Sequence, residues 1–397
     1  MAAGFEEFTQ AVARAGRAGA SMTPARALTR VAVLGGGGEG RLLSALCLAE
    51  GAEVTLFSAY GAELEALRAS SGITLRGAGP VGTYAVDRDS GPSVRTTAEL
   101  DRAVAGAEVI FLTGPVHKQR TYAMVLADHL KDGQVLVIAP GRSLGALEAA
   151  WFLRIGGCAA DITLVEVQGL PFWFSEQGTV LTLSAMGRVA AATLPAGRTE
   201  VLVALSALLE NLDPCPDVLE SGFADGSGLV ELPALMLGGP GFGSAAPAVP
   251  TGGVPLAENA SFAALIGAEH RATIARLAEE RHAVARAFGL RNLPSAEDWI
   301  GLHAGALRGP GARAVPGRAA ALGVLRDGVI GSLVPLVSAA RIAGKAVPVT
   351  QAIVTLASTV LGADVAAAGR RLDTIGIDAG DIDSARRVMD AIATGRR

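Results

Sequence analysis

The stretch Arg30-Val-Ala-Val-Leu-Gly-Gly-Gly-Gly-Glu-Gly-Arg41 decides the fold of this chain. The apolar residues 31–34 are typical of a buried strand, and the glycines after them predict a tight turn that leads into a helix. Gly35, Gly37 and Gly40 have the G-x-G-x-x-G spacing of a dinucleotide-binding βαβ unit. A second apolar run at 52–57 supplies the next strand of that unit. The stretch therefore predicts a nicotinamide dinucleotide site, with a purely structural glycine turn as the alternative.

The glycines of this turn have separate roles in such a site. Gly35 permits the tight turn, Gly37 lets main-chain N–H groups approach a diphosphate, and Gly40 lets the helix pack closely on the strand. Gly38 lies among them, and we include it in the cofactor site. Glu39 is the exception, because a carboxylate beside a diphosphate repels it. We therefore expect the Glu39 side chain to point away from the cofactor.

The second strand ends in Leu56-Phe-Ser-Ala-Tyr60, and this segment bears on the choice of cofactor. A site for NAD is expected to carry an Asp or Glu here that holds the ribose 2′-hydroxyl, and the segment has neither. Ser58 could instead accept a 2′-phosphate. The pattern therefore leans weakly to NADPH, with NADH as the open alternative.

Strand-like and helix-like segments alternate through the first half of the chain, which predicts a doubly wound parallel sheet. Further strands are expected at 108–113, 134–139 and 161–166, with a small hairpin insertion formed by 73–76 and 83–86. Pro115 and the second glycine-bearing turn, Gly141-Arg-Ser-Leu-Gly145, follow two of these strands. Ligands bind at the carboxyl ends of such strands, so these loops should converge there.

The character of the chain changes near residue 210, after which helical patterns predominate. We expect a leader at 1–28, a Rossmann-type dinucleotide-binding domain at 29–210 and an all-helical substrate domain at 211–397. The fold class is thus α/β, an N-terminal doubly wound sheet with a C-terminal helical domain. The active site is expected between the two domains.

Composition restricts the classes of partner. The chain has 397 residues and a formal net charge of −4, and no basic stripe is present that would neutralise nucleic-acid phosphates. Its three cysteines and five histidines lack metal-ligand or disulfide spacing. No secretory signal is recognisable and no apolar run reaches membrane-spanning length. We expect a cytoplasmic protein with a small-molecule substrate and no membrane partner; a homodimer is among the assemblies open to it.

Several separated segments resemble the octopine/nopaline (opine) dehydrogenase family, in the same order along residues 30 to 380. Besides the glycine-rich turn they are Pro115-Val-His117, 126–133, Pro140-Gly-Arg-Ser-Leu-Gly-Ala-Leu-Glu148, Glu166-Val-Gln-Gly-Leu-Pro171, 280–289, Ser332-Leu-Val-Pro-Leu336, 356–364 and 369–372. The resemblance implies NAD(P)H-dependent reductive condensation of an amino acid with a 2-oxo acid. It also implies a Rossmann half joined to a helical substrate domain.

The chain departs from that family where the resemblance would place the catalytic groups. The family's reaction depends on a histidine–aspartate pair and a substrate-binding arginine. The histidine position here holds Leu232, or Glu231 if the gap moves by one residue. The arginine and aspartate correspond to Gly323 and Gly328, with Arg326 and Asp327 close by but out of register. The departure favours a substrate other than the usual pair and leaves cofactor binding intact.

Four residues are therefore the candidates for chemistry. Glu231 lies in the apolar run 229–237, where an unpaired carboxylate would have a raised pKa and could donate a proton; the alternatives are a solvated residue or a partner for an arginine. His117 follows a sheet strand and could contact cofactor or substrate, or simply begin a helix. Asp327 is a weaker catalytic candidate, and Arg326 could bind a substrate carboxylate. For His129, His270, His282 and His303 we expect exposed structural roles.

Three functions remain open. The leading one is an NAD(P)H-dependent oxidoreductase, built like an opine dehydrogenase, that transfers hydride to a C=N or C=O carbon in specialised metabolism. The second is orthodox opine synthesis, with Glu231 and Asp327 in place of the family's pair. The third is a dinucleotide-binding sensor or scaffold without turnover.

Overall fold

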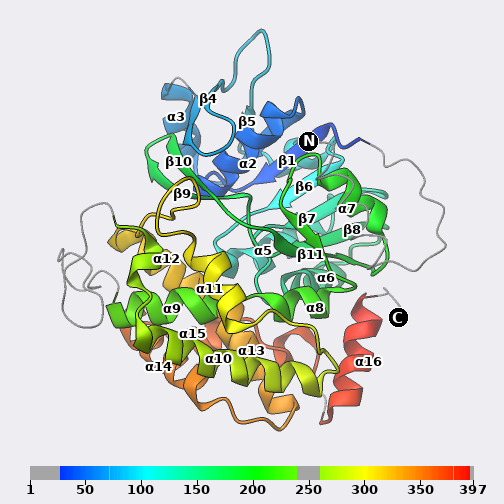
Figure 1. The fold of residues 1–397 in the computed structure, drawn as a ribbon. Coiled ribbons are helices and arrows are strands. Elements are labelled where there is room, and N and C mark those ends of the chain that lie inside the picture. The colour runs from blue at the N-terminus through cyan, green and yellow to red at the C-terminus, as the bar shows by residue number, and fades with distance from the viewer. Residues whose placement is uncertain (1–26, 71, 239–259, 379, 394–397) are drawn as a thin grey trace.

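The computed structural model describes residues 27–70, 72–238, 260–378 and 380–393. The expected leader at 1–28 lies almost entirely outside these residues. The β-rich half and the helical half pack against each other, with the sheets in one and helices α9 to α14 in the other (Figure 1). This arrangement confirms the predicted α/β fold class.

An eight-stranded sheet forms the centre of the first half. Its strands pair in parallel except β11, which runs antiparallel to β8. In spatial order they are β12 (Leu212–Pro214), β11 (Val189–Leu194), β8 (Thr163–Val167), β7 (Val135–Ile138), β6 (Val109–Leu112), β1 (Arg30–Leu34), β2 (Glu53–Phe57) and β5 (Arg95–Thr97). The helices between them are α2 (Gly38–Ala49), α3 (Gly61–Ala69), α4 (Leu100–Val104), α5 (Val116–Leu126), α6 (Gly145–Ile155) and α7 (Thr199–Leu205). Strand β12 belongs to this sheet but lies just beyond residue 210. The domain boundary at residue 210 stays a prediction.

The central strands are apolar on both faces because helices cover both sides of the sheet. Alternate residues of β1 belong to different cores: Val31 and Val33 pack in one cluster, and Ala32 and Leu34 in the other. All four are at most 3% exposed. This two-sided burial explains why the strand reads as a continuous apolar run.

A second, four-stranded sheet lies beside the first. The predicted hairpin insertion is confirmed as β3 (Ile73–Gly77) and β4 (Gly82–Tyr84), which pair antiparallel. Strand β3 also pairs in parallel with β10 (Val180–Ala185), which forms a hairpin with β9 (Phe172–Gln177). The sequence analysis did not predict this second hairpin, and β9 carries aromatic side chains that reach the functional site.

Helix α9 (Ser227–Gly238) is central to the helical half and packs against α10, α11 and α12. The remaining elements are α8 (Val218–Ala224), η1 (Phe262–Leu265), α10 (Ala268–Ala287), α11 (Ala296–Ala304), α12 (Arg318–Gly328), η2 (Val329–Leu333), α13 (Val334–Ile342), α14 (Pro348–Leu361), α15 (Val365–Ala368), η3 (Asp373–Ile375) and α16 (Ile382–Ala393). Contrary to the expectation that no apolar run reaches membrane-spanning length, the continuous helix 318–342 is long and apolar enough to cross a membrane. The segments 348–361 and 365–375 are so only when taken together, with a bend of 105° between them. Within the continuous helix, 61% of the most apolar segment is buried inside the protein, as in the core helix of a globular protein.

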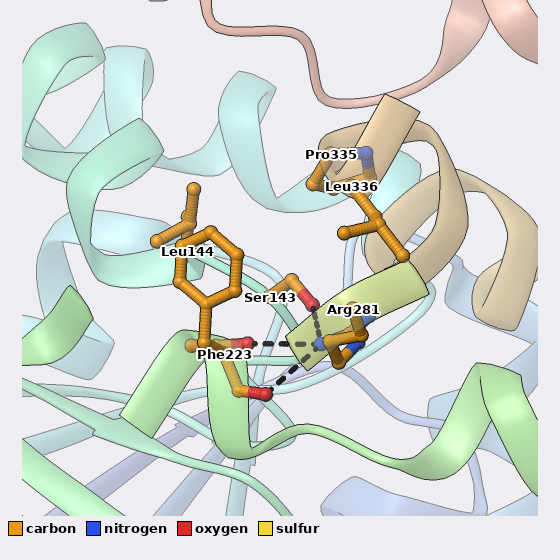
Figure 2. Close-up of a pocket in the computed structure, with 7 residues that line it drawn as sticks. Ser143, Leu144, Phe223, Arg281, Pro335 and Leu336 are labelled. Atoms are coloured by element: carbon orange, nitrogen blue, oxygen red, sulfur yellow. Dashed lines mark hydrogen bonds between the residues drawn. The ribbon is translucent and has the colours of Figure 1, made fainter. Parts of the chain in front are cut away.

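Buried arginines join the two halves. Figure 2 shows Arg281 of α10 donating to the hydroxyl of Ser143, on the Rossmann side, and to the carbonyls of Gly222 and Phe223. Arg370 donates to Glu148 of α6 at 2.9 Å and to the carbonyl of Ser143 at 2.6 Å. These bonds satisfy carbonyls that would otherwise be buried without a donor, and they fix the loop after β7 between the halves.

Candidate active site

The carboxyl ends of the central strands meet at one edge of the large sheet. Leu34 is in register with Phe57 of β2 and with Leu112 of β6, and Leu112 with Ile138 of β7. The loops after these strands therefore lie together, as predicted. A cleft of about 780 Å³ runs from there to helices α9, α11 and α12. Its wall includes Gly37, Gly38, Gly40 and Pro115 from the expected cofactor site, together with Arg142, Trp173, Glu231, His303, Arg313 and Asp327.

The glycine-rich turn has the geometry that a diphosphate site requires. Gly35 has a φ of +129°, which favours glycine, and its N–H donates to the carbonyl of Phe57 at 2.9 Å. A Cβ on Gly40 would lie 1.7 Å from the carbonyl oxygen of Gly35, so only glycine permits this approach of helix and strand. A Cβ on Gly37 would meet nothing within 4 Å, which leaves its face of the turn open. The residues present thus fit a dinucleotide diphosphate at the start of α2.

The prediction that Glu39 points away from the cofactor site is wrong. Its side chain lies on the wall of the cleft and accepts the N–H of Gly114 at 2.8 Å. Burial and the neighbouring carboxylate of Asp327 raise the pKa of Glu39 to about 7, against the opposing effects of Gly114 and Arg142. A carboxyl group that is readily neutral near pH 7 is compatible with an anionic ligand in a way that an ionised one is not.

The turn after β7 aims a guanidinium into the cleft. Arg142 and Leu144 have φ angles of +54° and +63°, which strain side chains other than glycine. Neighbouring groups hold this shape: Gln168 donates to the carbonyl of Arg142 at 2.6 Å, and the N–H of Ser143 donates to the carbonyl of Gly331 at 2.9 Å. Such strain, fixed by surrounding hydrogen bonds, is typical of functional sites.

Glu231 is fully buried and paired with two arginines. Its Oε1 accepts from Arg313 at 2.8 Å, and its Oε2 lies 3.6 Å from the guanidinium of Arg142. The structure therefore brings Glu231 to the cleft, as the sequence analysis proposed, but as a partner for arginines rather than as an unpaired carboxyl group. Glu231 organises two cations from separate parts of the chain.

Arg313 and His303 complete this end of the cleft. The Arg313 guanidinium lies between two rings, 3.9 Å from the centre of Trp173 and 4.2 Å from that of Phe262. His303 of α11 is 2% exposed, and its Nδ1 has no hydrogen-bond partner among the described residues. Burial lowers the pKa of His303 to about 4, although Glu231 and Asp225 oppose the shift, so the imidazole is neutral at pH 7. The prediction of an exposed role was wrong for His303 and also for His270, which is fully buried.

The remaining candidates lie near the glycine turn. Asp327 is on the cleft wall and pairs with Arg326 at 3.1 Å, while the Arg326 side chain is 41% exposed. His117 is the second residue of α5, and these two charges lie nearby. Its pKa is lowered by burial and by Arg326, and its Nδ1 has no partner among the described residues. At the end of β2, Ser58 is buried and donates its hydroxyl to Glu63 at 2.6 Å.

Sequence reasoning missed Arg142, Arg313, His303 and Trp173 as site residues. Arg142 had a usable signal, because it follows a parallel strand within a glycine-bearing turn. Arg313 is separated from Glu231 by 82 residues, and no local pattern connects them. Among the described residues, no three or more His, Cys, Asp or Glu side chains are grouped to hold a metal ion.

Comparison with known proteins confirms the predicted resemblance. The chain is 26% identical over 360 residues to a protein named opine dehydrogenase from Arthrobacter sp. (strain 1C), covering 87% of this chain and 94% of that one. No protein-family model matches the chain.

Solved structures confirm the fold. Octopine dehydrogenase with NADH and pyruvate superposes with a TM-score of 0.62 at 18% identity, covering 93% of this chain and 98% of that one. Yersinopine dehydrogenase with NADP+ bound gives 0.60 at 13% identity, covering 93% and 99%. The names of both structures include a nicotinamide dinucleotide, which is NADH in the first and NADP+ in the second.

Proposed function

We propose that this protein is an NAD(P)H-dependent dehydrogenase of the opine dehydrogenase kind, which reduces a C=N or C=O carbon of a small carboxylate substrate. One observation carries the proposal: a single cleft connects the glycine-rich turn to the cluster of Arg142, Glu231, Arg313 and His303. A nicotinamide dinucleotide at the turn and a substrate at the cluster would share this cleft. The cytoplasmic location expected from the sequence is part of the proposal.

The charges of the cluster favour a substrate with one carboxylate. Arg142 and Arg313 contribute two positive charges, Glu231 contributes one negative charge and the His303 imidazole is neutral. One positive charge remains within this cluster, Arg318 and Asp327 elsewhere on the cleft wall offset each other, and guanidinium groups bind carboxylates through paired hydrogen bonds. Arg142 is the better donor to a substrate, because Arg313 already donates to Glu231 and to the carbonyl of His303, whereas Arg142 has only a 3.6 Å ion pair with Glu231. A 2-oxo acid, or the imine formed from one, meets this requirement.

Each side chain then has a separate task in the reaction. When bound, the dinucleotide supplies the hydride. Arg142 holds the carboxylate, and Glu231 positions the guanidiniums of Arg142 and Arg313. His303 is neutral at pH 7 and has no acidic proton to give, so its proposed task is to orient the substrate, and the proton that the reduced carbonyl takes up comes from water. The roles proposed for Asp327 and His117 are supporting ones near Arg326, and Arg326 itself binds Asp327.

A second candidate function is orthodox opine synthesis, in which an amino acid and a 2-oxo acid are joined. The relative named opine dehydrogenase favours it, because the match covers 94% of that protein. The arrangement at Glu231 supports a different set of catalytic groups from the one that the resemblance implies.

Fluorescence titration with NADH and NADPH tests the first step, and binding of neither would contradict the proposal. Oxidation of the bound cofactor is then followed with 2-oxo acids alone and with 2-oxo acids plus a panel of amino acids. Turnover that requires the amino acid identifies opine synthesis, and turnover without it identifies simple reduction. Tight cofactor binding with no turnover on either panel would favour the non-catalytic sensor or scaffold.

A further inference from the structure

The corner of the site between β1 and β2 contains an acidic residue that its position in the sequence conceals. Ser58 follows β2, where an acid is expected in an NAD site, but Glu63 reaches the same place from the first turn of α3. The Ser58 hydroxyl donates to Oε2 of Glu63 at 2.6 Å, and the N–H of Tyr60 donates to the Ser58 hydroxyl at 3.0 Å. A serine and a glutamate five residues apart thus place one carboxylate where a single Asp or Glu would lie.

The contact with the glycine turn fixes the position of this carboxylate. A Cβ on Gly36 would lie 2.4 Å from Oε2 of Glu63 and 2.9 Å from Cβ of Ser58. Gly36 is the second residue of the G-x-G-x-x-G pattern and lacks a positive φ. A side chain is therefore excluded at this position by lack of space and not by the backbone conformation. The carboxylate of Glu63 therefore lies against the turn itself.

We infer that Glu63 is the residue that selects the dinucleotide, and that it selects NADH. The inference rests on the proposed function, since it concerns the same cofactor site. In this fold an acidic group beside the first β–α turn accepts a hydrogen bond from the ribose 2′-hydroxyl. Oε1 of Glu63 makes no hydrogen bond with the described residues and is available for that hydroxyl. A 2′-phosphate at this place would instead face a carboxylate of like charge.

Two cations on the neighbouring helices, Arg68 and Lys118, already have other partners. Arg68 of α3 binds Asp87 and Thr96, and Lys118 of α5 donates to the hydroxyl of Tyr60 at 3.3 Å. Lys118 is the group that would favour a 2′-phosphate. Glu63 outweighs it because its carboxylate is in contact with the turn, whereas Lys118 reaches Tyr60. This reverses the weak lean to NADPH, which depended on finding no acid at the end of β2.

The test is a binding titration, followed by fluorescence, of the wild-type protein with NADH, NADPH and the 2′-deoxyadenosine analogue of NADH. A hydrogen bond to a charged group predicts that NADH binds roughly 10- to 100-fold more tightly than either of the other two. In Glu63→Gln the affinity for NADPH should rise by about tenfold relative to NADH. Glu65→Gln, an exposed carboxylate on the same helix, controls for the general effect of charge and should leave the ratio unchanged.

The outcomes separate this inference from the function on which it rests. A wild-type preference for NADPH, or an unchanged ratio in Glu63→Gln, would overturn the selection of NADH by Glu63 and leave the dehydrogenase intact. Equal shifts in the Glu63 and Glu65 variants would overturn it too, because the effect would then be one of net charge. Binding of neither dinucleotide would overturn the proposed function and this inference with it.

Discussion

The two ends of the cleft are built in different ways. At the cofactor end, main-chain geometry defines the diphosphate site, and six consecutive residues, 35–40, contain most of it. At the substrate end, side chains define the site, and they come from the loop after β7, from α9, from α11 and from the loop before α12. The first end is local in sequence and the second is not.

This difference separates what can be changed at each end without loss of the fold. A main-chain site fails when an added atom blocks a close approach of two backbone segments. A side-chain site fails when one charge is removed and its buried partners are left without compensation. Substitutions at the two ends should therefore differ in their balance between stability and binding.

The largest effect is expected at Glu231. Replacement by Gln leaves the guanidiniums of Arg142 and Arg313 buried without a counter-charge, which should lower the free energy of unfolding by about 4 kcal/mol. Urea denaturation measures this change. The control is Glu279→Gln, which breaks an exposed pair with Arg276 and should cost less than about 1 kcal/mol. Equal losses in the two variants would show that the buried cluster does not hold the substrate end together.

A pair of glycine variants tests the cofactor end. In Gly40→Ala the new Cβ would lie 1.7 Å from a carbonyl oxygen, so strand and helix must separate, at about 2 to 3 kcal/mol of stability. In Gly37→Ala the Cβ meets no protein atom within 4 Å, so stability should be unchanged while the methyl group keeps the diphosphate at a distance. Thermal unfolding and cofactor titration together distinguish the two. Normal cofactor binding by Gly37→Ala would rule out a diphosphate on this face of the turn.

Arg142 offers a way to remove a binding group without removing the fold. Asparagine adopts positive φ angles at lower cost than arginine, and Glu231 keeps its hydrogen bond from Arg313, so Arg142→Asn should retain the strained turn and most of the stability of the protein. Loss of a charged hydrogen-bond donor should raise the KM for a carboxylate substrate by roughly 10- to 100-fold. Steady-state kinetics on the active substrate checks this, with Arg341→Asn on the exposed end of α13 as the control. An unchanged KM would mean that another cation of the cleft, and not Arg142, binds the substrate carboxylate.

The sequence predicted the cofactor end because every part of its signal is short-range. Strand, turn and helix follow one another between residues 30 and 48, and the G-x-G-x-x-G spacing reports the backbone directly. The strands that complete the sheet were equally visible, since burial on both faces makes each a short apolar run. The hairpin of β9 and β10 was not recognisable in the sequence, because its place in the fold depends on the pairing of β10 with β3, which lies about 100 residues earlier in the chain.

The substrate end could not be predicted in the same way. Glu231 was recognisable as a carboxylate in an apolar run, but its partners Arg142 and Arg313 lie 89 and 82 residues away in the chain. Whether such a carboxylate is unpaired or neutralised depends on tertiary packing alone. Glu39 was misplaced for a related reason: repulsion from a diphosphate was considered, but not the N–H of Gly114, which holds the carboxyl group on the cleft wall.

The smallest expected effect concerns Glu39 and the pH of cofactor binding. With its pKa raised to about 7 by burial and by Asp327, the Glu39 carboxyl is neutral below that pH and ionised above it. A bound diphosphate favours the neutral form, so binding takes up a proton and affinity falls as pH rises through 7. A decrease of about tenfold in affinity between pH 6 and pH 8.5 corresponds to a rise of about one unit in the pKa of Glu39 when the diphosphate binds. His303, with a pKa of about 4, stays neutral over this range and contributes no slope.

Titration of NADH binding across this range should give a flat profile in Glu39→Gln, whose side chain keeps the shape of glutamate without its charge. If the variant keeps the wild-type slope, another group near the turn must carry the proton, and His117, whose pKa is lowered by burial and by Arg326, is the next to replace.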